Sequence, residues 1–228
     1  MIRTPRSSST PFRGEEGDES GPDEVLEFAS QAVEYVRRTL GVALEYDSDT
    51  LPLLDHYLRQ VGLPPAAARA VAAADRPEVV AADLVAATAG AYFGEVVRRR
   101  LGGSWHLPSR DPGSWRLVLP SGLWFFPVAV AMAAIVGPTA DDGAPERDPD
   151  EDPDEDDELA QVDAAEKSVD EWDPSLQAPP LLRAQVQRVL HGMADVSEEE
   201  YYSLCCRLDT LEHVQSVLAA VASAPRAH

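Results

Sequence analysis

Residues 90–105, GAYFGEVVRRRLGGSW, join the end of a long apolar helix to a glycine break and a tryptophan. From Pro77 to Leu101 the apolar residues fall on most sides of a helix, a pattern that indicates a helix buried at the centre of a domain. Pro77 suits a first helical turn, because its missing N–H would have no partner there. Gly102 and Gly103 end the helix. We therefore expect the rest of the fold to pack around this helix.

Two glycines lie four residues apart inside this helix, at Gly90 and Gly94. A glycine in a helix interior costs about 1 kcal/mol relative to alanine, so two of them need a structural reason. They share a face with Ala87 and Ala91, which are also small. A phosphate-binding loop would place its glycines at a helix N-terminus, where backbone N–H groups are free. The spacing therefore predicts that another backbone comes close to this face.

Glu95 directly follows the second glycine. A partly buried carboxylate can act as a general base or as an ion-pair partner. Arg98 and Arg99 lie three and four residues further on, the spacing at which helical side chains meet. We expect Glu95 to pair with one of them, or to contact Arg116 or Trp115 further along the chain. A role in a binding site is the alternative.

The hydrophobic pattern changes its period after the helix. Three short runs, SWHL, SWRLVLP and LWFFP, lie within residues 104–127 and are separated by turn-forming clusters of Pro, Ser and Gly. Aromatic and β-branched runs of this kind predict two or three antiparallel strands. A short helix is predicted over residues 128–137, and helical spacing predicts two more helices over residues 23–40 and 49–61. Residues 23–137 are the predicted core domain.

The negative charge of the chain is concentrated in one segment. The chain has 40 acidic and 19 basic residues, a net charge of −21, and 17 of the acids but only two of the bases lie within residues 141–173. Like charges and repeated prolines prevent a packed core there, so residues 138–175 are predicted to be a disordered acidic linker. Residues 1–22, rich in Ser, Pro and charge, are predicted to be a disordered tail.

Two amphipathic helices are predicted within residues 176–223. The second begins with a capping box, in which Ser197 is followed three residues later by Glu200. Each helix has an apolar face that needs a partner, so we expect the pair to pack back on the core. The expected fold class is α+β, mainly helical, with a small two- or three-stranded antiparallel meander and a disordered acidic insertion.

The composition argues against several classes of protein. A single lysine, Lys167, does not make the basic patch that nucleic-acid phosphates require. The longest nearly uncharged apolar run, Leu123–Val136, is too short to cross a bilayer, and the N-terminal residues lack the apolar part of a secretion signal. Cys205 and Cys206 are adjacent, so they cannot join distant segments. We expect a cytoplasmic protein that binds neither nucleic acid nor membranes.

Catalytic and metal-binding motifs are missing from the sequence. It contains no H-E-x-x-H pair, nucleophile elbow, phosphate-binding loop or dinucleotide fingerprint. Cys206 and His213 share a helix face but lie about 10 Å apart along the helix axis, too far for one metal ion. Arg207 could lower the pKa of a neighbouring thiol, but small buried packing residues are the favoured interpretation of the two cysteines. We expect no catalytic residue, no metal and no cofactor.

Several segments together suggest a family resemblance. LLDHYLR, GAYFGEVVRRRLGGSW, the W-x-L-x-L hairpin and the ending SEEEYYSLCCRLDTLEHV are similar to uncharacterised domains of small proteins from GC-rich, developmentally complex, myxobacterium-like bacteria. Their signature is a Tyr-x-Gly-Glu-Val helix followed by a Gly-x-Trp strand, which corresponds here to Tyr92, Gly94, Glu95, Gly103 and Trp105. The resemblance implies a shared domain and no particular activity.

These observations favour a non-enzymatic cytoplasmic interaction protein. Its partner is expected to be a basic protein, and the role that of an adaptor, a regulator or an immunity-type inhibitor. The alternative is a small hydrolase or ligand-binding domain that uses Glu95 with His106 and Trp105. The candidate binding residues are therefore Tyr92, Glu95, Trp105 and His106. A third possibility is a scaffold whose C-terminal helices exchange between protomers, and the sequence leaves the oligomeric state open.

Overall fold

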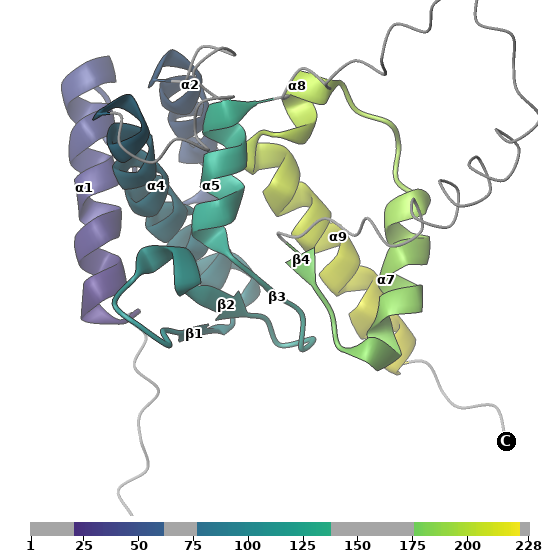
Figure 1. Ribbon diagram of the computed structural model, residues 1–228. Helices are drawn as coiled ribbons and strands as arrows, with labels where there is room; N and C mark the ends of the chain where they lie inside the picture. Colours follow the sequence, from purple (N-terminus) through teal and green to yellow (C-terminus); the bar gives the residue numbers. More distant parts are fainter. Residues whose placement is uncertain (1–20, 62–76, 138–175, 224–228) are drawn as a thin grey trace, which may run out of the picture.

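The computed structural model of the protein describes residues 21–61, 77–137 and 176–223. The predicted disordered segments, residues 1–22 and 138–175, lie outside the described residues, apart from the last two residues of the tail. The described residues form seven α-helices and one four-stranded antiparallel sheet, so the chain has an α+β fold that is mainly helical (Figure 1).

In chain order, the elements are α1 (Asp23–Leu40), η1 (Ser48–Thr50), α2 (Leu51–Val61), α4 (Pro77–Leu101), β1 (Ser104–His106), η2 (Pro112–Ser114), β2 (Arg116–Val118), β3 (Trp124–Phe125), α5 (Pro127–Val136), β4 (Leu176–Gln177), α7 (Pro180–His191), α8 (Glu198–Tyr201) and α9 (Leu204–Ser223).

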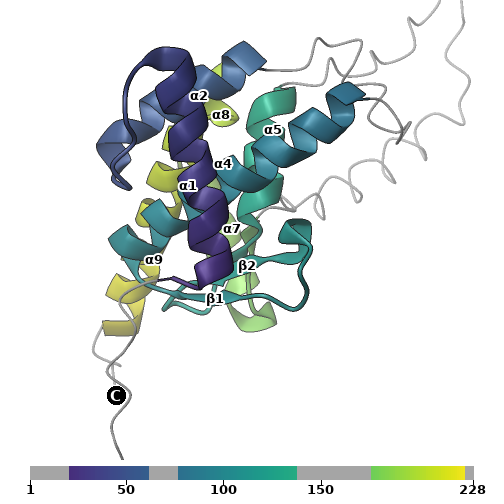
Figure 2. The same ribbon diagram turned by 90° about the vertical axis from the view of Figure 1, so that its left-hand side faces the viewer.

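The helix α4 is the centre of the fold, as the sequence predicts. Every residue from 86 to 97 is buried, and α4 makes its most extensive contacts with α1 on one side and α5 on the other. Figure 2 shows α1 lying across α4, with the sheet below both helices. An apolar pattern on most sides of a helix thus corresponds to a helix enclosed on most sides.

Gly90 and Gly94 allow other elements to approach α4 closely. A Cβ on Gly90 would lie 2.6 Å from the Cα of Val128 and 2.7 Å from the carbonyl oxygen of Pro127, at the start of α5. A Cβ on Gly94 would overlap the ring of Trp105. The predicted close approach is confirmed, although at Gly94 the near neighbour is a side chain instead of a backbone.

The sheet has one more strand than the sequence indicates. The strand order is β1-β2-β3-β4, and β4 belongs to the segment that follows residues 138–175. The prediction of two or three strands missed β4 because a two-residue strand leaves almost no periodic signal. Its residue Leu176 pairs with Phe125, so the sheet is completed from a distant part of the chain.

The two faces of the sheet differ in polarity. Trp105, Leu117, Phe125 and Leu176 lie opposite one another across the four strands and face the core, where all but the half-buried Trp105 are fully buried. The neighbouring positions point to the other face, because side chains alternate along a strand. His106 and its cross-strand partner Arg116 belong to that outer face.

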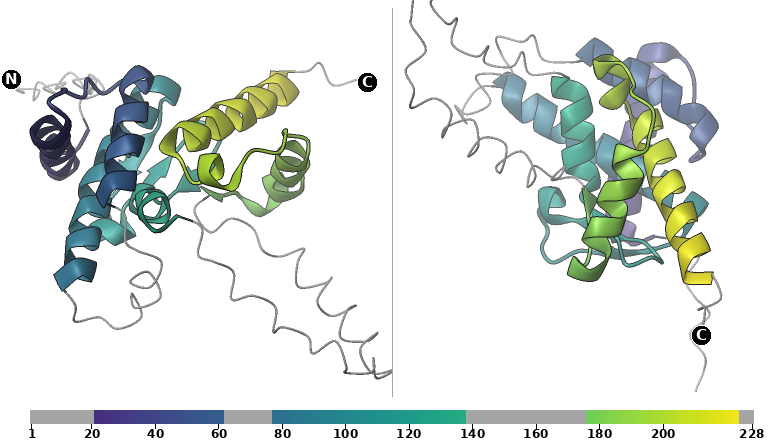
Figure 3. Two further views of the ribbon diagram at one scale, coloured as in Figure 1. Left: turned by 90° about the horizontal axis from the view of Figure 1, so that it is seen from above. Right: turned by 90° about the vertical axis from the view of Figure 1, so that its right-hand side faces the viewer.

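The C-terminal segment, residues 176–223, packs back on the core as expected. Helix α9 contacts α2, α5 and α4 of the core as well as α7. Viewed from above, α5 stands between the core helices and the pair α7 and α9 (Figure 3). The predicted final helix is interrupted, however, because α8 ends at Tyr201 after about one turn and α9 starts afresh at Leu204. Among the helices of residues 21–61, 77–137 and 176–223, none is both long and apolar enough to span a bilayer.

Candidate functional site

Glu95 is enclosed by hydrogen-bond donors in the interior. Its side chain has no exposed surface, and it lies next to Arg98, whose side chain is 14% exposed. The Nε of Arg98 donates to Oε1 at 2.9 Å and its Nη2 donates to Oε2 at 3.0 Å. The indole N–H of Trp105 donates to Oε1 at 2.7 Å. A fully buried charge is tolerated only when it is paired and hydrogen-bonded in this way.

The predicted pairing of Glu95 with an arginine three or four residues away is confirmed, and Arg99 adds a longer contact of 3.7 Å. The alternative contact with Trp115 or Arg116 is not the one formed. Trp115 instead donates its indole N–H to the backbone oxygen of Ser109 at 3.0 Å. The tryptophan that reaches Glu95 is Trp105, because the turn at Gly102 and Gly103 brings β1 back along the end of α4.

Gly21 covers the carboxylate of Glu95 from outside. Gly21 is buried, and a Cβ at this position would overlap the Oε1 atom of Glu95. Only a residue without a side chain fits between the carboxylate and the solvent. The last residues of the predicted tail are therefore part of the fold, and they close the space in which a substrate would have to lie.

Tyr92 anchors the segment between α1 and α2. Its hydroxyl accepts a hydrogen bond from the backbone N–H of Tyr46 at 2.9 Å and shares a second one with Thr50 at 2.8 Å. Burial raises the pKa of the Tyr92 hydroxyl, so the phenol is neutral at physiological pH. The ring of Tyr46 lies 4.8 Å from that of Tyr92, and Arg99 stacks on Tyr46 at 4.4 Å.

Of the four candidate binding residues, the structure brings three into one network, in which Tyr92 and Glu95 are buried and Trp105 is half-buried. Glu95 contacts Trp105 directly, and Tyr92 joins them through Tyr46 and Arg99. His106 is exposed on the outer face of β1 and points away from this network, because it neighbours the inward-facing Trp105 along the strand. The geometry therefore supports a packing role for Glu95 and gives no support to an acid–base pair with His106.

Asp55 has a structural role that the sequence pattern did not reveal. Its side chain is only 5% exposed, and its two oxygens accept hydrogen bonds from the backbone N–H groups of Leu204 at 2.7 Å and Cys205 at 3.2 Å. These groups are at the start of α9, so a carboxylate on α2 caps a helix 149 residues away. Local capping rules consider only neighbouring residues, which is why this cap could not be predicted.

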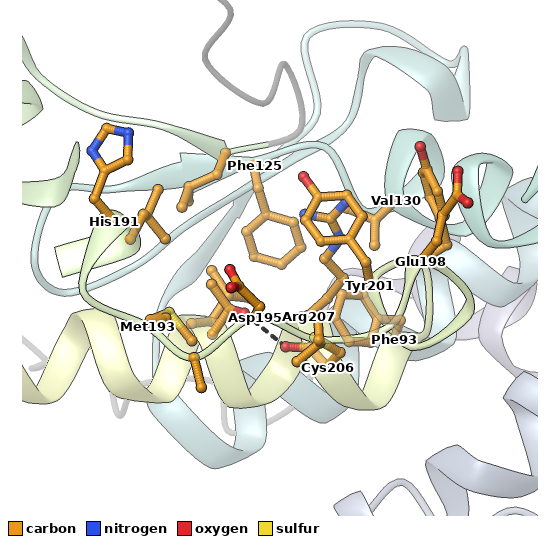
Figure 4. A pocket seen from close by; sticks show the side chains of 17 residues that line it. Phe93, Phe125, Val130, His191, Met193, Asp195, Glu198, Tyr201, Cys206 and Arg207 are labelled. Carbon is orange, nitrogen blue, oxygen red and sulfur yellow. Dashed lines mark hydrogen bonds between the residues drawn. The ribbon is translucent and has the colours of Figure 1, made fainter. Parts of the chain in front are cut away.

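A cavity of about 550 Å³, which we call the interlobe pocket, opens between the core and the C-terminal segment. Core residues Phe93, Phe125 and Val130 line one side of it. The other side is formed by β4, the end of α7, α9, and residues 192–203, the connection between α7 and α9 that we call the strap. Figure 4 shows the rings of Phe125 and Tyr201 in the middle of the pocket, with His191 at the opposite end from Glu198.

The lining of the interlobe pocket is largely apolar and aromatic, with charged groups from the strap and α9. Its apolar members include Leu176, Leu190, Met193, Val196 and Leu211, and its aromatic members are Phe93, Phe125, Tyr201 and Tyr202. The charged residues are Asp195, Glu198 and Arg207, and the guanidinium of Arg207 lies 4.2 Å above the ring of Tyr201. A cavity of this size with a few polar groups is typical of a binding site.

The strap is strongly acidic. Its sequence GMADVSEEEYYS holds four carboxylates, Asp195 and Glu198–Glu200, and no basic residue. All four carboxylates are exposed. A second cavity of about 480 Å³ borders the strap as well, and its lining includes Glu199 and Glu200. The sequence shows this run of acids followed by two tyrosines, but its local pattern predicts only the capping box of Ser197 and Glu200.

The two cysteines adjoin these cavities without being activated. Burial, together with the hydrogen-bonded Asp55, raises the pKa of the Cys205 thiol to about 12. Burial also raises the pKa of Cys206, and the nearby Arg207 does not reverse this shift. Both thiols are therefore protonated at neutral pH, as suits packing residues and not nucleophiles.

Within the described part of the chain, His, Cys, Asp and Glu side chains form no group of three or more that could hold a metal ion. The residues of the proposed family signature, from Tyr92 to Trp105, lie around Glu95, and the family resemblance stays a prediction. Comparison of the chain with protein-family models, curated proteins and solved structures found no match.

Proposed function

We propose that the protein is a non-enzymatic interaction protein of the cytoplasm, an adaptor, a regulator or an immunity-type inhibitor, that docks a basic segment of a partner protein in the interlobe pocket. The observation that carries this proposal is the combination of an open, largely apolar cavity of about 550 Å³ with an acidic strap beside it. Apolar side chains of the partner would fill the cavity, and its basic residues would face the strap.

The apolar lining supports the affinity part of this proposal. Tyr201 and Val196 are 41% and 44% exposed although they border a cavity, so the free protein keeps apolar surface in contact with water. Burying such surface contributes roughly 25 cal/mol per Å² to association. Large aromatic side chains in a recess are also the residues that most often dominate binding energy at interfaces.

The charge distribution supports the choice of a basic partner. The strap carries four carboxylates without a basic residue, within a chain whose net charge is −21. Opposite charges steer two proteins together and exclude partners of like charge, and their effect falls as salt screens them. A catalytic role for Glu95 or the cysteines has little support, because Glu95 is enclosed and the pKa of each cysteine thiol is raised.

A site-specific photo-crosslinking experiment tests the proposal. A photo-crosslinking amino acid at Val196, which lines the pocket, should capture a basic protein from lysate, and one at Val42, exposed in the core segment and outside the pocket lining, should not. The affinity of the purified partner is then measured by calorimetry at low and high salt. We expect the affinity to fall as the salt concentration rises.

Matched charge variants show whether the strap is the site. Asp195→Lys with Glu198→Lys should weaken partner binding by at least about tenfold, which corresponds to about 1.4 kcal/mol. Glu27→Lys with Glu45→Lys changes the net charge equally, at exposed positions outside the pocket lining, and should have little effect. Equal loss of affinity in both double variants would mean non-specific attraction, and a partner that binds both with unchanged affinity would refute the proposed site.

Ala194→Trp, at an exposed strap position that lines the pocket, should also block binding.

A further inference from the structure

We infer that the interlobe pocket is selective for an alkylammonium group, supplied by a lysine side chain of the partner, whose methylene stem lies in the cavity and whose ammonium lies among the tyrosines and carboxylates. This inference rests on the proposed function and names the chemical group that the pocket binds. Its basis is the arrangement of aromatic rings and charges that line one cavity.

Two pairs of steeply inclined aromatic rings line the pocket. The rings of Phe93 and Phe125 are 5.9 Å apart at 64°, and those of Tyr201 and Tyr202 are 5.2 Å apart at 89°. Phe93 and Phe125 are 0% and 1% exposed and add almost no accessible ring surface, whereas Tyr201 is 41% exposed and Tyr202 is half-buried. Because the face of an aromatic ring is negative, the two tyrosine rings attract ammonium groups, especially methylated ones.

The charges that line the pocket act in the same direction. The lining contains two carboxylates, those of Asp195 and Glu198, and one basic side chain, that of Arg207. The guanidinium of Arg207 already stacks on Tyr201 at 4.2 Å, which demonstrates that this aromatic wall accommodates a cation. The two carboxylates and the ring of Tyr202 are the groups that favour a second cation. The lining therefore holds one more negative than positive charge, which disfavours an anionic ligand.

The apolar part of the lining suits the stem of a lysine. Leu190, Met193 and Val196 are half-buried or exposed and provide apolar surface free of charge. Val130, Leu176 and Leu211 also line the pocket but are nearly fully buried. A lysine side chain buries its methylene groups along apolar surface while its ammonium stays near water and counter-charges. An ammonium on a short polar stem would match only the charged part of this lining. An apolar side chain without charge would match only its apolar part.

Titration of the isotope-labelled full chain, followed by NMR, tests the inference with defined probes. Acetyl-Leu-Lys-Leu-amide should bind about tenfold more tightly at low salt than acetyl-Leu-norleucine-Leu-amide, which has a comparable apolar stem and no ammonium. The largest shifts should fall on the strap and on Thr210, which lines the pocket. Hexylamine is the third probe, because it carries the ammonium without a peptide.

Variants at exposed charged positions, and one at the half-buried Tyr202, separate charge selectivity from folding. Asp195→Asn with Glu198→Gln should reduce the preference for the lysine peptide to below about twofold, and Glu27→Gln with Glu45→Gln should leave it unchanged. Tyr202→Leu should weaken the lysine peptide more than the norleucine peptide, because leucine keeps apolar contact and loses the aromatic face.

The possible outcomes distinguish this inference from the proposed function. Equal binding of the lysine and norleucine peptides overturns the inference, and a basic partner captured at Val196 would then still support the proposed function. Hexylamine binding tenfold tighter than the lysine peptide overturns the assignment to a protein side chain and points to a free amine. A lysine preference that both double variants retain also overturns it, because the selectivity would then arise elsewhere.

Discussion

At Glu95 the protein keeps a negative charge entirely out of water, with donors from Arg98 and Trp105 on its two oxygens. The pair contributes little when it is compared with an apolar pair of the same shape, because both groups lost their hydration. Removing one member of the pair lowers stability strongly, because the remaining group stays buried without its counter-charge. Glu95 is therefore a residue on which the fold depends, whatever the pocket binds.

Substitution of Glu95 should lower stability strongly. We expect Glu95→Ala to reduce the free energy of unfolding by about 3–5 kcal/mol, and Glu95→Gln, which keeps the shape, by about 1–3 kcal/mol, both measured by urea denaturation. Glu34→Gln removes an exposed carboxylate that pairs with Arg37 and Arg38, and it should have little effect. A Glu95→Gln protein as stable as the wild type would instead favour a functional role for this carboxylate.

The raised pKa of the Cys205 thiol predicts that the folded protein loses stability at high pH. Its thiol has a pKa of about 12 in the folded protein and an ordinary value of 9.0 when unfolded. Because the folded pKa is the higher one, the thiol's contribution is complete below pH 9.0 and is lost between pH 9.0 and about 12. The free energy of unfolding of the wild type should fall more steeply across this window than that of Cys205→Ala, whose slope reports the tyrosines and other groups. Parallel slopes would contradict the prediction.

Among the elements, the contact between α4 and α5 depends on a missing side chain. Gly90→Ala would place a Cβ 2.6 Å from the Cα of Val128, so the two helices must separate. We expect a loss of about 1–3 kcal/mol in the free energy of unfolding, because overpacking outweighs the roughly 1 kcal/mol that alanine gains as a helix former. Thermal and urea denaturation both measure it. A stabilised variant would show that α5 moves freely.

The start of α9 depends on Asp55, which accepts hydrogen bonds from the first backbone N–H groups of that helix. Asp55→Ala should raise hydrogen exchange in the first turn of α9 and lower stability by about 1–3 kcal/mol, since two backbone donors lose their acceptor. Asp47→Ala is the matched control, because that carboxylate caps only the neighbouring η1 through the N–H of Thr50. Equal exchange in both variants would mean that Asp55 does not hold α9.

Local pattern therefore predicted the elements better than it predicted their partners. The helical spacing of the apolar residues and the glycines at the helix ends located α1, α4 and α5. The three-residue spacing of Glu95 and Arg98 indicated the ion pair between them. The fourth strand and the cap from Asp55 join residues separated by a long insertion, and a sequence carries no periodic trace of such contacts. The pocket was missed for the same reason, since Phe93 and Leu211 each belong to an ordinary apolar stripe.

For the whole molecule, the C-terminal segment should stay bound to the core without a covalent link. It contributes β4, donates backbone hydrogen bonds to Asp55 of the core, and forms an ion pair between Arg100 and Glu212 at 2.8 Å. A protease site introduced into residues 138–175 and cut under native conditions should give two pieces that co-elute in size-exclusion chromatography. Separation of the pieces in the wild type, and not only in Asp55→Ala, would contradict this docking.

The interlobe pocket also has a consequence for the order of events during synthesis. Phe93 and Val130, on one side of the pocket, leave the ribosome well before Tyr201 and Leu211 on the other. A nascent chain can thus hold the residues of its first helices and still lack one side of the pocket. The partner that we propose for this pocket could bind only after α9 has been translated.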